Sequence, residues 1–252
     1  MEPEEYEKLA RVEREHWFYR GKREIVRYWI RQTLPLQADS LLVDCGAGTG
    51  LFAREMTKDC RVLATDDHED SLRLLRERLG PDRVLNASCV ELPLPNATVD
   101  CLTALDVLEH VADDRSAVAE FARVLKPGGV AVVTVPAMQL LWSDWDRVLH
   151  HFRRYDRPAL QILFDPVHFE ILHLNYINVL ALPAILLTRK LRVLFPTRKS
   201  GGRLEEFIPP SILNGFLRQS FVSLACQRFL RFPAGVGLLA VARRRDSSIP
   251  QQ

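Results

Sequence analysis

The stretch LLVDCGAGTG at residues 41–50 predicts a strand that runs directly into a glycine-rich turn. Its first half is apolar, and its second half places glycine at positions 46, 48 and 50. Glycine adopts backbone conformations that other residues avoid, so such a turn lets the main chain approach a bound nucleotide closely. A strand, a glycine turn and a following helix therefore predict a nucleotide-binding unit.

Outward from this turn, short apolar segments alternate with segments of helical periodicity. The apolar segments are rich in Val, Leu and Ala without strict alternation, which is typical of strands buried on both faces. Strand–helix alternation at this spacing predicts right-handed crossovers and an α/β fold, a doubly wound, seven-stranded, mostly parallel Rossmann-like sheet. The expected strands lie in 41–44, 61–65, 83–87, 101–106, 130–135, 168–176 and 235–244.

Five regions are expected along the chain. Residues 1–37 are expected to form an N-terminal helical cap that is broken or kinked near Gly21, and residues 38–176 the cofactor-binding Rossmann-like core. Residues 177–231 are expected to be a helical insertion or lid. Residues 232–245 are expected to complete the sheet with a last strand, and residues 246–252 to form a flexible tail.

Bulk composition indicates a soluble globular protein. The 252 residues are 47% hydrophobic and 26% charged, and the net charge of +2 is too small to indicate nucleic acid binding. The five cysteines are scattered without a C-x-x-C pair, so neither a disulfide framework nor a metal site is expected. The first residues are acidic and polar, so they are not expected to act as a signal peptide. We therefore expect a cytoplasmic protein.

The basic segment 177–204 carries Arg and Lys but no acid, which leaves two interpretations open. It forms either a lid over a lipophilic or anionic acceptor, or a patch that rests on a membrane surface. Its apolar run, residues 177–187, is too short to span a bilayer. Pro183 and Pro196 interrupt any long helix, which weighs against membrane contact.

Two kinds of cofactor site use a strand, a glycine turn and a helix. The dinucleotide fingerprint G-x-G-x-x-G fits Gly46 and Gly48, but Leu51 occupies its third glycine position. The residues present instead read D-x-G-x-G-x-G, with Asp44 at the end of the strand. A carboxylate there repels a pyrophosphate and suits a ligand that carries an ammonium group. The pattern favours S-adenosylmethionine over NAD.

From these residues the chain resembles the class I S-adenosylmethionine-dependent methyltransferases, most closely over residues 38–138. The resemblance implies that the turn holds the amino acid end of the cofactor. It also implies that the acid closing the second strand, Asp66 with Asp67 beside it, binds the ribose hydroxyls, since a carboxylate accepts strong charge-assisted hydrogen bonds. The turn residues implied are Asp44, Gly46, Ala47, Gly48 and Gly50.

Two further stretches carry the resemblance. NASCVELPLPNATVD at 86–100 is similar to the stretch of the family around the adenine, with Ser88 where an acid often stands. Because a serine hydroxyl accepts less strongly than a carboxylate, the backbone N–H of Cys89 or Val90 is expected to donate to the nitrogens of the adenine ring. LDVLEHV at 105–111, which includes Asp106, resembles the wall of the cofactor and active site.

The acceptor side is expected from HHFRRY at 150–155 and HWFYRGKR at 16–23, which resemble a subgroup of bacterial small-molecule methyltransferases. The resemblance implies His151 or His110 as a base, with Tyr155 at the catalytic site. Arg153, Arg154 and Trp17 are expected to bind the acceptor, and Arg20 the cofactor carboxylate. The alternatives are that the arginines form surface ion pairs and that the aromatic residues pack in the core.

The predicted function is methyl transfer from S-adenosylmethionine to an oxygen, nitrogen or carbon of a small molecule. A nucleic acid acceptor is not expected, because LDVLEH stands where base-methylating enzymes carry a D/N-P-P-Y/F motif. Two alternatives stay open, a non-catalytic cofactor-binding scaffold and an NAD(P)-dependent oxidoreductase. The oligomeric state is not predicted.

Overall fold

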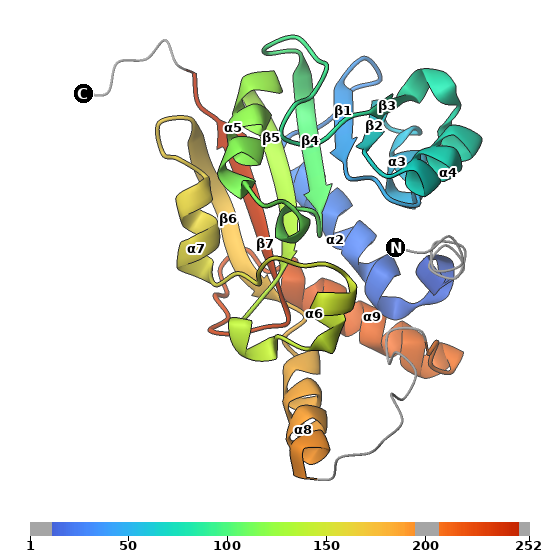
Figure 1. Ribbon diagram of the computed structural model, residues 1–252, viewed down its shortest axis with the longest axis vertical. Coiled ribbons are helices and arrows are strands. Elements are labelled where there is room, and N and C mark those ends of the chain that lie inside the picture. Colours follow the sequence, from blue (N-terminus) through green and yellow to red (C-terminus); the bar gives the residue numbers. More distant parts are fainter. Residues whose placement is uncertain (1–11, 195–206, 247–252) are drawn as a thin grey trace.

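The computed structural model describes residues 12–194 and 207–246. Its centre is a seven-stranded sheet with the strand order β3-β2-β1-β4-β5-β7-β6 (Figure 1). Strand β7 is antiparallel to both β5 and β6, and the other pairings are parallel. This confirms the predicted mostly parallel sheet. The strands are β1 (Leu41–Cys45), β2 (Arg61–Asp66), β3 (Val84–Asn86), β4 (Val99–Leu105), β5 (Leu125–Pro136), β6 (Phe169–Ile177) and β7 (Gly237–Arg244).

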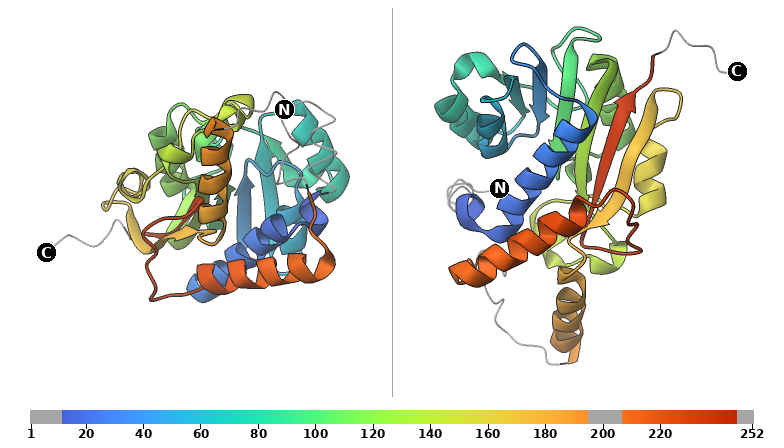
Figure 2. Two further views of the ribbon diagram at one scale, coloured as in Figure 1. Left: turned by 90° about the horizontal axis from the view of Figure 1, so that it is seen from below. Right: turned by 180° about the vertical axis from the view of Figure 1, so that it is seen from behind.

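Helices cover both faces of the sheet (Figure 2). On one face α5 and α7 bury Phe121 and Phe164, and on the other α2, α3 and α9 bury Ile25, Phe52 and Phe221. Fully burying one such side chain contributes about 1.5–3 kcal/mol, so the two cores hold the sheet in place. The helices are α2 (Trp17–Thr33), α3 (Leu51–Met56), α4 (Glu69–Leu79), α5 (Asp114–Val124), α6 (Asp144–Val148), α7 (Arg157–Leu163), α8 (Ala181–Leu194) and α9 (Ser211–Ala225), with short 3-10 turns at Pro81–Arg83, Leu108–His110 and Gln139–Leu141.

Strand β5 begins earlier than the apolar pattern indicates. Val99 of β4 pairs with Leu125, and Cys101 pairs with Val130, so residues 126–129 are extra residues in the ladder. Residues 126–128 are exposed. The predicted turn at Lys126-Pro127-Gly128-Gly129 is therefore an irregularity within β5, because its flanking residues continue to pair with β4.

The break in the N-terminal helical region lies at His16, and the prediction of a break near Gly21 is wrong. His16 has extended backbone angles and caps α2, its side chain accepting from the N–H of Phe18. Gly21 is helical, and a Cβ there would lie 2.7 Å from Cδ1 of Phe221 in α9. Glycine at this position thus permits the close packing of α2 against α9 that Figure 2 shows.

We expect Gly21→Ala to lower the free energy of unfolding by about 1 kcal/mol. The added methyl group overpacks the contact with Phe221, which costs about 1–3 kcal/mol, whereas the higher helix propensity of alanine stabilises the helix by up to about 1 kcal/mol. Gly215→Ala in α9 is the matched control, because a Cβ there meets nothing within 4 Å. It should raise stability by about 0.5–1 kcal/mol. Urea unfolding measures both, and equal stabilisation by the two changes would show that Phe221 moves aside.

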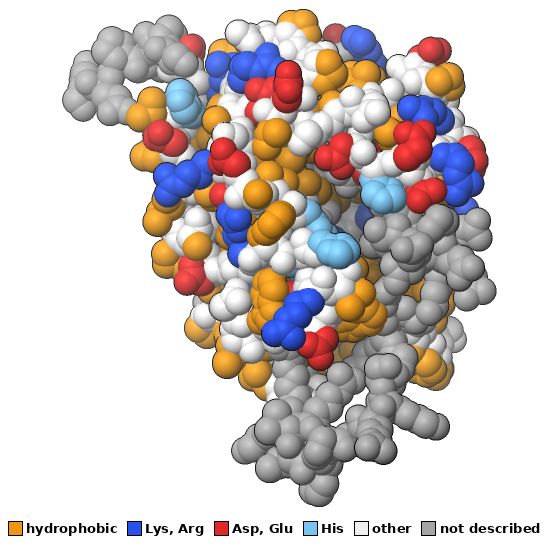
Figure 3. Space-filling model, in the orientation of Figure 1, with side chains coloured by type: hydrophobic (Ala, Val, Ile, Leu, Met, Phe, Trp, Pro, Cys, Tyr) orange, Lys and Arg blue, Asp and Glu red, His pale blue; other side chains and the backbone are white. Residues whose placement is uncertain are grey.

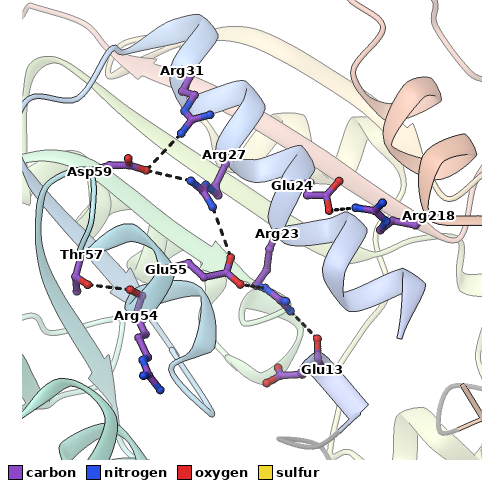
Figure 4. A network of polar contacts seen from close by, with 10 residues as sticks. All are labelled: Glu13, Arg23, Glu24, Arg27, Arg31, Arg54, Glu55, Thr57, Asp59 and Arg218. Carbon is purple, nitrogen blue, oxygen red and sulfur yellow. Dashed lines mark hydrogen bonds and ion pairs between the residues drawn. The ribbon is translucent and has the colours of Figure 1, made fainter. Parts of the chain in front are cut away.

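A row of arginines fastens α2 alongside α3 (Figure 4). Arg23 Nε lies 3.0 Å from Glu55 Oε1, and Arg27 and Arg31 approach Asp59 at 3.3 and 3.6 Å. Partly exposed ion pairs of this kind contribute about 0–1 kcal/mol each. Their main consequence is positional, because they hold α2 in a fixed direction across the sheet.

The segment between β6 and β7 lies at the carboxyl edge of the parallel strands, because β6 runs parallel to β5 and β7 runs back. It contains α8, which extends away from the sheet, and α9 (Figure 1). A lid role for residues 177–231 stays a prediction, and residues 195–206 of that segment and the tail 247–252 lie outside the described residues. In the described part of the chain, no helix has the length and apolar content needed to cross a membrane.

Candidate active site

The glycine turn after β1 is built from three residues with left-handed backbone angles. Gly46, Gly48 and Gly50 have φ of 60°, 54° and 74°. A Cβ on Gly46 would lie 2.6 Å from Val107 Cγ2, and one on Gly50 would lie 2.5 Å from Leu75 Cδ2, so both are required for packing. A Cβ on Gly48 would meet nothing within 4 Å. The turn therefore has an open side at Gly48, where a ligand can approach the main chain.

Asp66 at the end of β2 holds this turn. Its Oδ2 accepts the N–H of Gly48 and its Oδ1 accepts the N–H of His68, each at 3.0 Å. The hydroxyl of Ser71 donates to the carbonyl of Gly48 at 2.7 Å. Since each carboxylate oxygen carries two lone pairs, Asp66 retains acceptor capacity toward hydroxyl groups placed beside the turn. Its position fits the predicted contact with a ribose.

Asp44 lies in β1 beneath the turn and is buried. Its Oδ1 accepts the hydroxyl of Thr103 at 2.6 Å. Burial raises the pKa of Asp44 to about 7, and the nearby carboxylates of Asp66 and Glu13 add to this effect. A cation brought to this position stabilises the ionised form of Asp44. The site therefore suits a ligand with an ammonium group, as the sequence indicates.

The loop after β3 places the predicted adenine contacts beside Asp66. The N–H of Ala87 donates to the carbonyl of Asp66 at 3.1 Å, and Ser88 follows it, half-buried. Cys89 is buried, and burial, with a smaller effect of Asp67, raises its pKa to about 11. Asp67 and Val90 are exposed. The ends of β2 and β3 thus bring the ribose and adenine candidates together.

The end of β4 carries a charged pair that sequence patterns did not indicate. Asp106 has a left-handed backbone with φ 57°. Its carboxylate accepts hydrogen bonds from the ammonium group of Lys22 in α2 and from the hydroxyl of Thr134, the second at 2.9 Å. Burial alone raises the pKa of Asp106, but these contacts outweigh it and lower the pKa. The ion pair therefore ties the N-terminal helix to the end of β4.

The N-terminal segment also contacts the turn itself. The carboxylate of Glu13 accepts the hydroxyl of Thr49, and burial raises the pKa of Glu13. The predicted contacts Trp17 and Arg20 lie further along: Trp17 packs edge-on against Phe221, with ring centroids 5.8 Å apart, and Arg20 is exposed. The structure thus brings Glu13 against the turn, while Trp17 packs on α9.

Three potential ligand groups gather just beyond β4, although His151 is 42 positions from Glu109 in the chain. One ligand atom each from Glu109, His110 and His151 lies within 4.8 Å of the other two. The two imidazoles meet edge-on with ring centroids 4.6 Å apart. Desolvation, followed by the neighbouring His151, lowers the pKa of His110 to about 4, whereas burial and then Asp106 raise the pKa of Glu109. Histidine side chains are visible on the face of the molecule that Figure 3 presents.

Asp146 in α6 orients one of these imidazoles. Its Oδ1 lies 3.0 Å from Nδ1 of His151 and 2.7 Å from Nε of Arg154. Burial disfavours the charge of Asp146, but the hydrogen bonds from His151 and Arg154 outweigh this and lower the pKa of the carboxyl. An ionised carboxylate only accepts, so Nδ1 of His151 donates and Nε2 is the nitrogen with a free lone pair in the neutral ring.

Residues 43–133 match the family described as a methyltransferase domain. This part of the chain is therefore similar in sequence to a methyltransferase domain. A probable S-adenosylmethionine-dependent methyltransferase of Mycolicibacterium smegmatis is 32% identical over 137 residues, which is 53% of this chain and 52% of that protein. A ubiquinone/menaquinone biosynthesis C-methyltransferase of Marinomonas sp. is 31% identical over 139 residues, 49% of this chain and 55% of that protein. The chain thus spans about half the length of these curated relatives.

A solved structure supports the fold of the methyltransferase domain. A putative methyltransferase from Bacillus halodurans superposes with a TM-score of 0.58 at 15% identity, over 88% of this chain and 99% of that one. The predicted resemblance to class I S-adenosylmethionine-dependent methyltransferases is therefore confirmed, by sequence over residues 43–133 and by fold over most of the chain. The residues present fit that cofactor, because the open side of Gly48 adjoins Asp66, whose carboxylate suits hydroxyls, and the same turn follows the strand of Asp44, whose carboxylate suits an ammonium group.

The side chains of the RRY motif at residues 153–155 make contacts within the protein. The hydroxyl of Tyr155 donates to Asp114 Oδ2 at 2.8 Å and also lies 3.1 Å from the Leu108 carbonyl, and burial with the Asp114 contact raises the pKa of Tyr155. Arg153 pairs with Asp114 and Arg154 with Asp146, both at 2.7 Å. These contacts hold the loop in place, and the roles of Tyr155, Arg153 and Arg154 in catalysis or acceptor binding stay predictions.

Sequence reasoning missed four residues of this site. Lys22 and Glu109 stand inside stretches that the resemblance singles out, HWFYRGKR and LDVLEHV, but nothing local marks them. Asp146 closes a capping box with Ser143, and that S-x-x-D spacing was a readable signal. Glu13 precedes α2 in an ordinary charged segment. Their roles depend on contacts between distant segments, which periodicity does not reveal.

Proposed function

We propose that the protein transfers the methyl group of S-adenosylmethionine to a small-molecule acceptor. The observation that carries this proposal is the open side of Gly48, flanked by the carboxylates of Asp44 and Asp66. The curated relatives support it, since one is named as an S-adenosylmethionine-dependent methyltransferase and another as a methyltransferase of quinone biosynthesis.

The residues of this chain bind and orient the cofactor in this proposal. Asp44 receives the ammonium group, the Gly46–Gly50 turn lies along the amino acid end, and Asp66 accepts the ribose hydroxyls. Ser88 and the main chain of Cys89 and Val90 line the adenine. When bound, the cofactor supplies a methyl group on a positively charged sulfur.

The protein then has to align an acceptor with that methyl group and exclude water. The end of β4, where ligands bind in this kind of sheet, carries Asp106 and the neighbouring imidazoles of His110 and His151. In the neutral ring, Nε2 of His151 is available to take a proton from the acceptor, with Asp146 holding the ring. In this proposal the imidazole of His151 or His110 takes the proton of a methyl acceptor that carries a hydroxyl group.

We propose that the acceptor has a lipophilic part. The paired state of Arg153 and Arg154 removes two cations that an anionic acceptor was expected to use. Large apolar side chains are exposed on the helices between β6 and β7, which lie at the same edge of the sheet as the site. They include Leu186 and Leu187 on α8, and Ile212, Leu213 and Phe216 on α9.

Calorimetric titration with S-adenosylhomocysteine tests the cofactor, with NAD as the control. Saturable binding of S-adenosylhomocysteine alone supports the proposal. Binding of NAD instead would favour an oxidoreductase. Turnover is then tested with acceptors that share one hydroxyl headgroup and differ in alkyl chain. Cofactor binding without turnover of any acceptor would favour a non-catalytic scaffold.

Cofactor affinity should depend on pH through Asp44. Its pKa of about 7 in the free protein lies above the ordinary value of 3.8, so ionisation opposes folding as pH rises between these values. An ammonium ligand favours the ionised form, so affinity for S-adenosylhomocysteine should rise roughly ten-fold from pH 6 to pH 8, with proton release. Titrations in two buffers of different ionisation enthalpy measure both quantities.

Asp44→Asn is the control for this pH dependence. The amide keeps the shape of the side chain and cannot ionise, so the variant should bind weakly and equally at pH 6 and pH 8. Binding by the variant that rises with pH as in the unchanged protein would assign the titration to another group, with Glu13 and Asp66 the neighbouring carboxyls to replace next.

A further inference from the structure

Among the described residues, three acidic side chains near the end of β4 are paired with basic side chains, and a fourth, Glu109, is not. Asp106 pairs with Lys22, Asp114 with Arg153, and Asp146 with Arg154 and His151. Glu109 is 1% exposed, and its Oε2 has no hydrogen-bond partner in the described part of the chain. A buried carboxylate oxygen without a partner costs free energy and calls for an explanation.

Two imidazoles face this carboxylate. One ligand atom each from Glu109, His110 and His151 lies within 4.8 Å of the other two, close enough for the three to share one ion. Ligand atoms bound to one metal at about 2.0–2.2 Å lie within roughly 4 Å of one another, so a small adjustment of these side chains closes the group on an ion. The neighbouring cations do not oppose an ion strongly, because Lys22 and Arg154 are already neutralised by Asp106 and Asp146.

The surroundings hold one imidazole ready for a metal. Nδ1 of His151 donates to buried Asp146, which turns Nε2 outward as the ligand nitrogen. The loop that carries His151 is fastened to the same cluster, since the N–H of Phe152 donates to the carbonyl of Glu109 at 2.7 Å. A carboxylate that orients a ligand histidine is the usual second layer of a metal site.

We propose that Glu109, His110 and His151 bind a divalent first-row transition-metal ion at the acceptor side of the site. Two imidazoles and one carboxylate suit Zn²⁺, Co²⁺, Mn²⁺ or Fe²⁺ and leave coordination positions open. This ligand set goes beyond the sequence prediction, which assigned no metal ligand to the chain.

The role of the ion rests on the proposed methyl transfer. An open coordination position binds the acceptor hydroxyl, and the ion lowers the pKa of that hydroxyl, whose proton passes to solvent. The acceptor oxygen then forms a bond to the methyl carbon, the carbon–sulfur bond breaks, and its electron pair stays on sulfur. In this arrangement His110 and His151 serve as metal ligands rather than as proton acceptors.

Titration of the metal-free protein with Co²⁺ tests the site without cofactor or acceptor. Metal is first removed with a chelator, and the visible ligand-field absorption of Co²⁺ is recorded as it is added. We expect one equivalent of Co²⁺ to bind with the absorption of a nitrogen- and oxygen-ligated ion, and Zn²⁺ to displace it. Absence of a saturable Co²⁺ spectrum overturns the proposal.

Variants assign the ligands. Glu109→Gln and His151→Ala should each weaken Co²⁺ binding by more than about 100-fold, and Asp146→Asn by about 10- to 100-fold. His150→Asn is the matched control, because His150 is the exposed neighbour of His151 with φ 57°, a conformation that asparagine tolerates. Thermal unfolding confirms that each variant folds. Equal loss of Co²⁺ binding in His150→Asn would show a non-specific histidine effect and overturn the assignment.

Failure of this proposal is distinguishable from failure of the proposed function. Without a metal site, S-adenosylhomocysteine still binds and turnover is unaffected by chelator, which leaves His151 as a base. With a metal site and no methyl transfer, Co²⁺ binds while cofactor titration or turnover fails. Methyl transfer that is lost with chelator and restored by Zn²⁺ or Mn²⁺, but not in Glu109→Gln, supports both.

Discussion

Gly48→Val is expected to weaken binding of S-adenosylhomocysteine by more than about 100-fold, which in practice abolishes it. The left-handed backbone at φ 54° costs a β-branched residue about 1–2 kcal/mol or more. The new side chain also fills the open side of the turn, where nothing lies within 4 Å of a Cβ. Calorimetric titration of the variant measures the loss.

Gly80→Val separates the two contributions. Gly80 also has a positive φ, 86°, and a Cβ there likewise meets nothing within 4 Å, but it stands at the C-terminal end of α4 and is not part of the turn after β1. This variant should be destabilised like Gly48→Val and retain cofactor affinity. If both variants bind the cofactor normally, the open side of Gly48 is not its site.

Asp66→Ala is expected to weaken cofactor affinity by about 1.5–3 kcal/mol, or about 10- to 150-fold, the range for hydrogen bonds to a charged group. The carboxylate accepts the N–H of Gly48 in addition to any ribose hydroxyl, so its loss also loosens the turn. Titration with S-adenosylhomocysteine measures the change, and an unchanged dissociation constant removes Asp66 from the ribose.

A second ligand distinguishes the ribose contact from a general loss of the site. Methylthioadenosine carries the ribose but no amino acid end. Asp66→Ala should weaken both ligands by similar factors, whereas Asp44→Asn should weaken S-adenosylhomocysteine and leave methylthioadenosine nearly unchanged. A variant of Asp66 that weakens only S-adenosylhomocysteine would move its contact to the amino acid end.

The two halves of the site differ in how they are built. The cofactor half consists of strand ends and turns, with Asp44, Gly48 and Asp66 within three consecutive elements of the chain. The acceptor half joins α2, the end of β4 and the loop before α7, through Lys22, Glu109 and His151. Substitutions in the first half should therefore act on cofactor affinity, and those in the second on metal binding and turnover.

The sequence by itself determined the parallel sheet and the position of the cofactor candidates. Apolar segments and helical periodicity alternate along residues 41–135, and both are local properties of the chain. In a parallel sheet the carboxyl ends of the strands meet at one edge, so acids and glycines that follow strands are gathered there by topology alone. The sequence pattern alone was therefore enough to name Asp44, Gly48 and Asp66 as cofactor candidates.

Only the tertiary structure decided the role of the residues beyond β4. Arg153 and Arg154 looked available for an acceptor, because nothing local shows that Asp114 and Asp146 lie against them. Glu109 looked like an ordinary loop residue until burial left its carboxylate without a partner beside His151, 42 positions along the chain. Pairing of charges depends on which segments pack together, and that is set by the whole core rather than by any short pattern.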